Sequence, residues 1–128
     1  MTFLLGERRV PRMSMMDWNE YRSQVVAGMG EIGRISPEIV KGYRALGGAA
    51  SKTGLLGAKV NELIALAVAV TVRCDGCISV HTAAASQAGA TREEIAEALG
   101  TAAAVNAGAA LVYSTRVLDA LAANTSAS

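Results

Sequence analysis

The stretch that decides the fold reads AKVNELIALAVAVTV over residues 58–72 and CDGCISVHTAAASQAG over residues 74–89. In the first part, apolar residues recur at spacings of three and four, which is the period of an α-helix. Its Leu-Ala-Val-Ala-Val letters would also suit a buried strand, but the length of the segment and its alanine content favour a helix. The second part predicts another helix, which begins at Cys74 and is closed by Gly89.

Start and stop signals place two more helices before this stretch. Asp17 predicts the N-cap of a first helix that runs to about residue 29 and ends at the glycines at 30 and 33. Ser36 and Pro37 are typical of the N-cap and first position of a second helix. That helix is expected to run through Leu46 and to stop at Gly47 and the glycine after it. Residues 1–13 predict an irregular N-terminal arm.

After the stretch, Thr91 and Glu94 form the signature of a capping box, which opens a further helix. This helix is expected to end near residues 106–108, and a last helix then covers residues 109–122. No segment alternates in the manner of a strand. The sequence therefore predicts a single all-α domain over residues 1–128.

Composition limits the function classes. Hydrophobic residues make up 52% of the 128 residues, which is more apolar surface than one small core can hide. We therefore expect a homo-oligomer with helical faces packed between subunits. The net charge of +1 argues against nucleic acid or an anionic membrane as partner. The longest apolar run, residues 63–70, is far shorter than the ~20 residues of a membrane span. With no signal peptide recognisable, we expect a cytoplasmic protein.

The candidate chemistry lies at the start of the helix that begins at Cys74. Cys74 and Cys77 stand at i and i+3, on one helical face, so that their sulfurs can meet. The helix N-terminus carries partial positive charge and free N–H groups, which stabilise a thiolate. His81 follows Cys77 by four residues on the same face, where an imidazole can move a proton to or from a thiol. In the cytosol such a cysteine pair is more often catalytic or metal-binding than structural.

Glu62 is a further candidate, because it lies on the preceding, almost uncharged helix. A carboxylate on an apolar helix needs a partner if it is buried. If the two helices fold back on each other, Glu62 can face His81 or the cysteines. On spacing alone, Glu62 can equally be an ordinary surface residue.

Three other interpretations stay open on residue patterns alone. The cysteines can be free thiols in a core, with His81 a core histidine. Alternatively, Glu62, Cys74, Cys77 and His81 can form a four-coordinate zinc site, although structural zinc sites usually take a second ligand pair from elsewhere. A thioredoxin-type fold is disfavoured, because its CxxC follows a strand.

Together these segments resemble the AhpD-like alkylhydroperoxidases of the carboxymuconolactone decarboxylase family. The resemblance spans residues 52–113 and includes Glu62, the CxxC pair with His81, and the AGAT-x-EE turn at residues 88–94. It implies an all-helical bundle that assembles as trimers or hexamers. It also implies that Cys77 is the peroxidatic cysteine, that Cys74 resolves it as a disulfide, and that His81 and Glu62 form a proton relay.

The resemblance further implies a hydroperoxide or disulfide substrate and a dithiol electron donor such as a lipoyl group or a thioredoxin-like protein. We expect a thiol peroxidase or disulfide reductase that uses no metal or organic cofactor. Relatives that decarboxylate lactones typically lack the CxxC, so the motif argues against that activity. One position departs from the alkylhydroperoxidases, which carry a second histidine where this chain has Gly76. The alternatives to a peroxidase or disulfide reductase are a redox-sensing or zinc-binding module and a decarboxylase-type enzyme.

Overall fold

The computed structural model describes residues 14–126, which fold into five helices. They are α1 (Trp18–Ile35), α2 (Pro37–Ser51), α3 (Gly57–Val72), α4 (Asp75–Gln87) and α5 (Arg92–Thr125). No strand occurs among these described residues, and the predicted all-α fold class is confirmed. The N-terminal arm predicted over residues 1–13 lies outside them.

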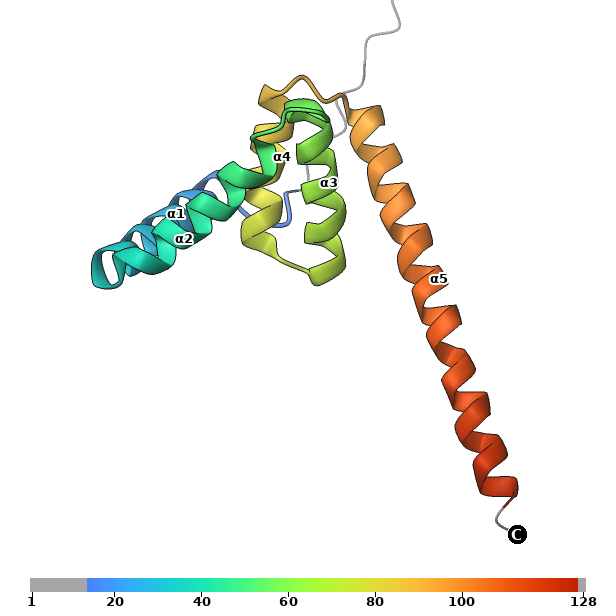
Figure 1. Cartoon of the computed structure of the whole chain (residues 1–128). Coiled ribbons are helices and arrows are strands. Elements are labelled where there is room, and N and C mark those ends of the chain that lie inside the picture. Colours follow the sequence, from blue (N-terminus) through green and yellow to red (C-terminus); the bar gives the residue numbers. More distant parts are fainter. Residues whose placement is uncertain (1–13, 127–128) are drawn as a thin grey trace, which may run out of the picture.

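Helix α3 is the centre of the arrangement, because it packs against α4 and α5. Helices α1 and α2 pack on each other as a hairpin, and α1 also contacts α4. Figure 1 shows the hairpin extending to one side of the α3–α4 pair, while α5 runs away on the other side. The candidate residues therefore lie on the two helices to which the other three attach.

The predicted ends of α1 and α2 were wrong, because glycines that were expected to stop these helices lie inside them. Helix α1 continues past residues 30 and 33 to Ile35, and α2 continues past residues 47 and 48 to Ser51. A glycine ends a helix when it adopts positive φ, and none of these four does. A Cβ on Gly33 would lie 3.3 Å from Val40 Cγ2, so this glycine instead lets α1 and α2 approach closely.

The predicted break between residues 106 and 108 was also wrong, since α5 is one continuous helix of 34 residues. The capping box that opens it is present as predicted, with Thr91 and Glu94 bonded reciprocally. The Asn106 side chain donates to the Ala102 carbonyl at 2.8 Å and to Thr71 Oγ1 at 2.9 Å. Asn106 therefore links α5 to α3, and helix α5 continues past this residue.

The apolar core formed by residues 14–126 is small. Its buried hydrophobic residues are Leu66, Ala69, Ala85 and Ala102, which come from α3, α4 and α5. Three of the four are alanines, which allow the helix axes to approach closely but bury little area each. Helix α5 is also long and apolar enough to cross a membrane by length and composition, and only 6% of that window is buried. Many large apolar side chains of the described residues are left exposed, among them Leu111, Val117 and Leu121.

Candidate functional site

The site is formed where α3 turns into α4. Arg73 ends α3 in the left-handed conformation, with φ of 55°. That conformation is costly for a residue with a Cβ, and it reverses the chain within a few residues. The N–H of Cys74 then donates to the Ala69 carbonyl at 3.0 Å, which closes the end of α3. Helix α4 consequently returns alongside α3.

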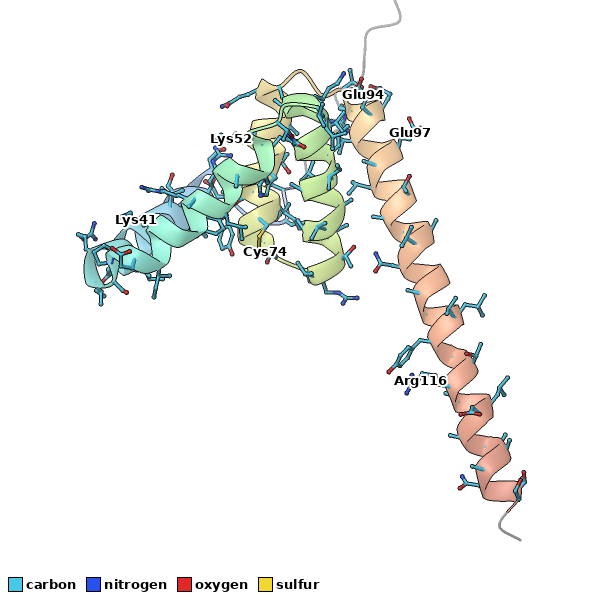
Figure 2. All side chains as sticks on the ribbon, in the orientation of Figure 1. Lys41, Lys52, Cys74, Glu94, Glu97 and Arg116 are labelled. Carbon is cyan, nitrogen blue, oxygen red and sulfur yellow. A yellow bond between two sulfur atoms is a disulfide. The ribbon has the colours of Figure 1, made fainter. Side chains whose placement is uncertain are left out.

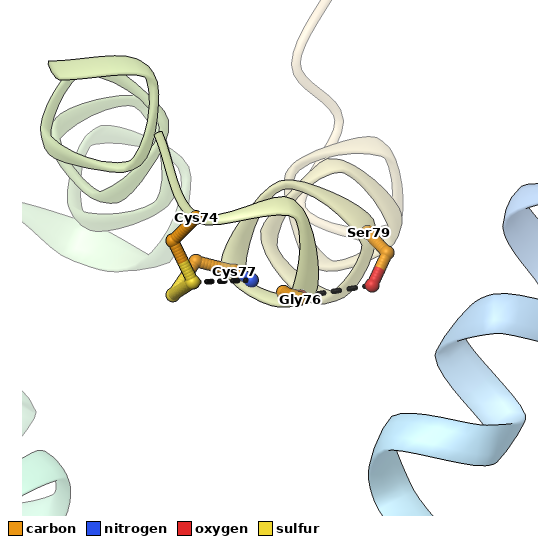
Figure 3. Close-up of a disulfide and its surroundings, with 4 residues drawn as sticks. All are labelled: Cys74, Gly76, Cys77 and Ser79. Carbon is orange, nitrogen blue, oxygen red and sulfur yellow. Dashed lines mark hydrogen bonds between the residues drawn. A yellow bond between two sulfur atoms is a disulfide. The ribbon is translucent and has the colours of Figure 1, made fainter. Parts of the chain in front are cut away.

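Cys74 is the N-cap of α4 and forms a disulfide with Cys77, with 5.2 Å between their Cα atoms. The Cys74 Sγ also accepts a hydrogen bond from the backbone N–H of Cys77, at 3.1 Å (Figure 3). The helix N-terminus therefore makes its hydrogen bond to the sulfur of Cys74 in this oxidised state. Both cysteines are half-buried, so they are not packed in a closed core.

His81 and Glu62 are joined across the contact between α4 and α3. His81 Nδ1 lies 2.7 Å from Glu62 Oε2, and their side chains are 30% and 25% exposed. The donor and acceptor of this bond depend on the imidazole tautomer; in the tautomer that carries its proton on Nδ1, the bond runs from Nδ1 to the carboxylate, and Nε2 is the ring nitrogen left for acid–base work. His81 follows Cys77 by one helical turn, a spacing that sets Cβ atoms about 5–6 Å apart.

Helix α1 supports the first turn of α4 from the other side. A Cβ on Gly76 would lie 3.5 Å from Val25 Cγ1, so the backbone of α4 passes close to α1 here. The Ser79 hydroxyl is bonded to the Gly76 carbonyl at 2.8 Å (Figure 3), and Arg22 donates to the Ser79 carbonyl at 3.3 Å. Arg22, Val25 and Ser79 were missed by sequence reasoning, because no local pattern marks contacts made from a helix some 50 residues earlier.

The zinc interpretation requires metal-binding side chains that lie close together. Among the residues that the structure describes, no three His, Cys, Asp or Glu side chains are grouped so as to hold a metal ion. Two surface hollows lie away from the cysteines, one along α5 around Arg116 and the other between α1 and α2 around Gly33. The side chains that α3 and α4 contribute here are the Cys74–Cys77 pair, the His81 imidazole and the Glu62 carboxylate.

Comparison with known sequences shows which protein family this chain is similar to. A sequence model of the carboxymuconolactone decarboxylase family matches residues 37–120, which span α2 to most of α5 and include Glu62, Cys74, Cys77 and His81. An uncharacterized protein of Haemophilus influenzae is 53% identical over 104 residues, which cover 81% of this chain and 92% of that protein.

Two further relatives are more distant. An uncharacterized protein of Cupriavidus necator is 37% identical over 89 residues, covering 70% of this chain and 79% of its own length. A protein described as uncharacterized protein 4 in the cox locus of Paracoccus denitrificans is 37% identical over 95 residues, or 74% of this chain and 86% of that protein. The descriptions of these relatives name no activity.

Proposed function

The chain belongs to the carboxymuconolactone decarboxylase family, and from this premise we propose that it is a thiol-dependent oxidoreductase that reduces hydroperoxides. The family resemblance expected from the sequence is thereby confirmed, whereas the reaction is our proposal. The observation that carries it is the Cys74–Cys77 disulfide on the same helix as His81, with the imidazole hydrogen-bonded to Glu62. A reversible disulfide beside a proton relay is what a two-cysteine peroxidase requires.

In the first half-reaction, Cys77 is the nucleophile. His81, held by Glu62, takes the proton of the Cys77 thiol, and the thiolate attacks one oxygen of the hydroperoxide ROOH. The O–O bond breaks, Cys77 becomes a sulfenic acid, and the leaving alkoxide takes the proton from His81 to give ROH. The thiol of Cys74 then attacks the sulfenic sulfur, which forms the disulfide and releases water.

The second half-reaction returns the enzyme to its dithiol form. A dithiol donor attacks the disulfide, and two exchange steps leave Cys74 and Cys77 reduced and the donor oxidised. The sum of both halves consumes one hydroperoxide and one dithiol, and it yields one alcohol, one water and one donor disulfide. The same site without a peroxide is a disulfide reductase, provided that a protein or small-molecule disulfide accepts the two electrons.

The test is turnover of cumene hydroperoxide with dihydrolipoamide as the donor. Cys77→Ser is expected to abolish turnover, since it removes the nucleophile. Cys74→Ser is expected to allow one equivalent of peroxide to react and then to stall, because no resolving thiol remains. Full activity of Cys77→Ser would end the assignment of Cys77 as peroxidatic.

Two other outcomes would point elsewhere. Wild-type protein that oxidises once and is not recycled by dithiol donors would be a redox sensor. Lactone decarboxylation that survives replacement of both cysteines would place the chain with the decarboxylating members of its family. Either result would overturn the peroxidase proposal.

A further inference from the structure

The hollow between α1 and α2, which we call the hairpin hollow, takes no part in the proposed redox reaction. It lies between residues 29–34 of α1 and residues 37–44 of α2. Figure 2 shows Lys41, which lines the hollow, on the hairpin and Cys74 at the start of α4. The volume of the hollow is about 350 Å³, at the lower end of the range of about 300–1,000 Å³ for ligand pockets. Its lining combines positive charges with apolar side chains.

Two glycines of α1 leave the space that forms the hollow. A Cβ on Gly33 would lie 3.3 Å from Val40 Cγ2, so α1 and α2 approach closely at this point. A Cβ on Gly30 would meet only the end of the Arg34 side chain, with Nη1 at 3.9 Å. Larger side chains at these two positions would fill the space between the helices. Glycine is less favourable than alanine inside a helix, so the hollow is kept at the expense of helix stability.

Three positive side chains line the hairpin hollow without a counter-ion among the described residues. Arg34 comes from α1, whereas Lys41 and Arg44 come from α2 and are three residues apart on one face. Both ion pairs found within residues 14–126 lie elsewhere, so no described carboxylate is within 4.0 Å of these cations. Like charges at this spacing repel each other. An anion bound between the three side chains would remove that repulsion.

The surroundings of the cations favour a carboxylate that is attached to an apolar chain. Residues 29–44 contain the three cations and two carboxylates, Glu31 and Glu38, so their net charge is +1 and one monoanion balances it. Guanidinium groups bind carboxylates through paired hydrogen bonds. Met29 and Val40 add apolar surface beside the cations, against which a hydrocarbon chain can pack.

We propose that the hairpin hollow is a binding site for an amphiphilic monocarboxylate. The three cations hold its carboxylate, and the apolar lining covers its chain. The site is separate from the thiols, because Arg34 lies nine residues along α1 from Val25, the neighbour of Gly76, which corresponds to about 14 Å of helix. The proposal is independent of the proposed oxidoreductase activity, since no residue of the hollow takes part in that reaction.

Titration of the full chain with octanoate, followed through backbone amide resonances, tests the proposal. Octanoate is expected to shift the resonances of Gly30 and Gly33 along one saturable curve. Acetate lacks the chain and 1-octanol lacks the charge, so each is expected to bind about 10-fold more weakly or worse. Raising the ionic strength from about 0.05 M to about 0.5 M should weaken octanoate binding, because the cations are exposed. Equal binding of 1-octanol would overturn the proposal.

Two glycine variants test whether the ligand occupies the hollow. Gly30→Leu fills the space without removing a charge and is expected to abolish saturable octanoate binding. Gly28→Leu is the matched control, because Gly28 lies on the same helix outside the lining and a Cβ there meets no atom within 4 Å. Leucine is a better helix former than glycine, so thermal unfolding of both variants should confirm that they fold. Wild-type affinity of Gly30→Leu for octanoate would contradict the assignment of the site.

A pair of charge variants tests the role of the cations. Lys41→Gln is expected to weaken octanoate binding about 10-fold, the usual contribution of a hydrogen bond to a charged group. Lys52→Gln, which removes the same charge outside the hollow, is expected to keep the wild-type affinity. Equal affinities of the two variants would overturn the proposed role of Lys41 and with it the site.

Two further outcomes would assign the binding elsewhere. Octanoate shifts that spread over residues 107–125 would show binding to the exposed apolar surface of α5 and would overturn the proposal. Sedimentation with vesicles of phosphatidylglycerol and phosphatidylcholine distinguishes a lipid surface from a soluble ligand. A chain that sediments with these vesicles but does not bind octanoate would recognise a lipid surface, and the proposed soluble ligand would be wrong.

Discussion

The Nδ1 atom of His81 lies 2.7 Å from the Oε2 atom of Glu62, and this bond joins the two helices that form the site. The residues are 19 apart in sequence and meet because Arg73 reverses the chain between α3 and α4. With Nδ1 as the donor of this bond, Nε2 is the ring nitrogen that is left for proton transfer.

The charge of Glu62 is expected to matter for turnover. Glu62→Gln keeps an oxygen that accepts from His81 Nδ1, but it removes the negative charge that stabilises the imidazolium. General acid–base catalysis typically contributes about 10²–10⁴-fold to the reaction rate. We expect Glu62→Gln to lower kcat/KM for cumene hydroperoxide by a factor at the low end of that range. Glu97→Gln, an exposed carboxylate on α5, is the control. Equal rates for both variants would exclude Glu62 from the relay.

The cap made by Cys74 is expected to contribute to stability when the disulfide is reduced. Cys74→Ser retains a side-chain acceptor for the Cys77 N–H, whereas Cys74→Ala removes it. Loss of an N-cap acceptor costs about 1 kcal/mol. In urea unfolding with a reductant present, the free energy of unfolding of Cys74→Ser should therefore exceed that of Cys74→Ala by about 1 kcal/mol. Identical midpoints would show that the helix does not depend on this acceptor.

The close contact of Gly76 with α1 is expected to limit what this position can carry. Gly76→Ala places a Cβ at 3.5 Å from Val25 Cγ1, an ordinary contact, and should be tolerated. Gly76→His adds a ring on the same side and should lower the free energy of unfolding by about 1–3 kcal/mol, the usual cost of overpacking.

Shortening the Val25 side chain tests whether overpacking causes the expected loss of stability. Val25→Ala in the Gly76→His background should recover part of the lost stability, because it makes room for the ring. A Gly76→His protein as stable as wild type would show that the imidazole avoids α1.

The ion pair between Lys59 and Glu94 is expected to make stability depend on pH in the acid range. A hydrogen bond from Lys59, at 2.9 Å, and one from the Thr91 N–H lower the pKa of Glu94 below its usual value of 4.5. In the folded state Glu94 therefore loses its proton at lower pH than in the unfolded state. Its contribution is complete above pH 4.5 and disappears as the pH falls through the lowered pKa.

The variant Glu94→Gln measures this contribution, because its amide oxygen can still accept from the Thr91 N–H. Thermal unfolding of both proteins should differ at pH 6 and converge as the pH is lowered below 4. Since the Glu94 side chain is 36% exposed and solvent screens the ion pair, the difference at pH 6 is expected to be small. A difference that grows towards low pH would have the wrong sign for a carboxylate with a lowered pKa.

Local sequence signals predicted where a helix begins when a capping side chain marks its first turn. Asp17 caps α1 as expected, its carboxylate accepting from the Glu20 N–H, and the capping box opens α5. Glycines were poor markers by comparison. Gly89, with φ of 83°, follows α4 as predicted, but Gly33 and Gly108 lie within helices. A glycine permits a left-handed turn without requiring one, so only the surrounding contacts decide whether the helix ends there.

The sequence by itself determined which segments are helical and that Cys74 and Cys77 share a face with His81, because these features depend on residues three or four apart. Only the tertiary structure decided which partner Glu62 meets, how α1 supports Gly76, and that α5 runs far beyond α3. These relationships depend on the turn at Arg73 and on how closely the helices approach each other. The residue pattern within one helix predicts neither the turn nor the distance between helices, because packing between segments distant in sequence decides both.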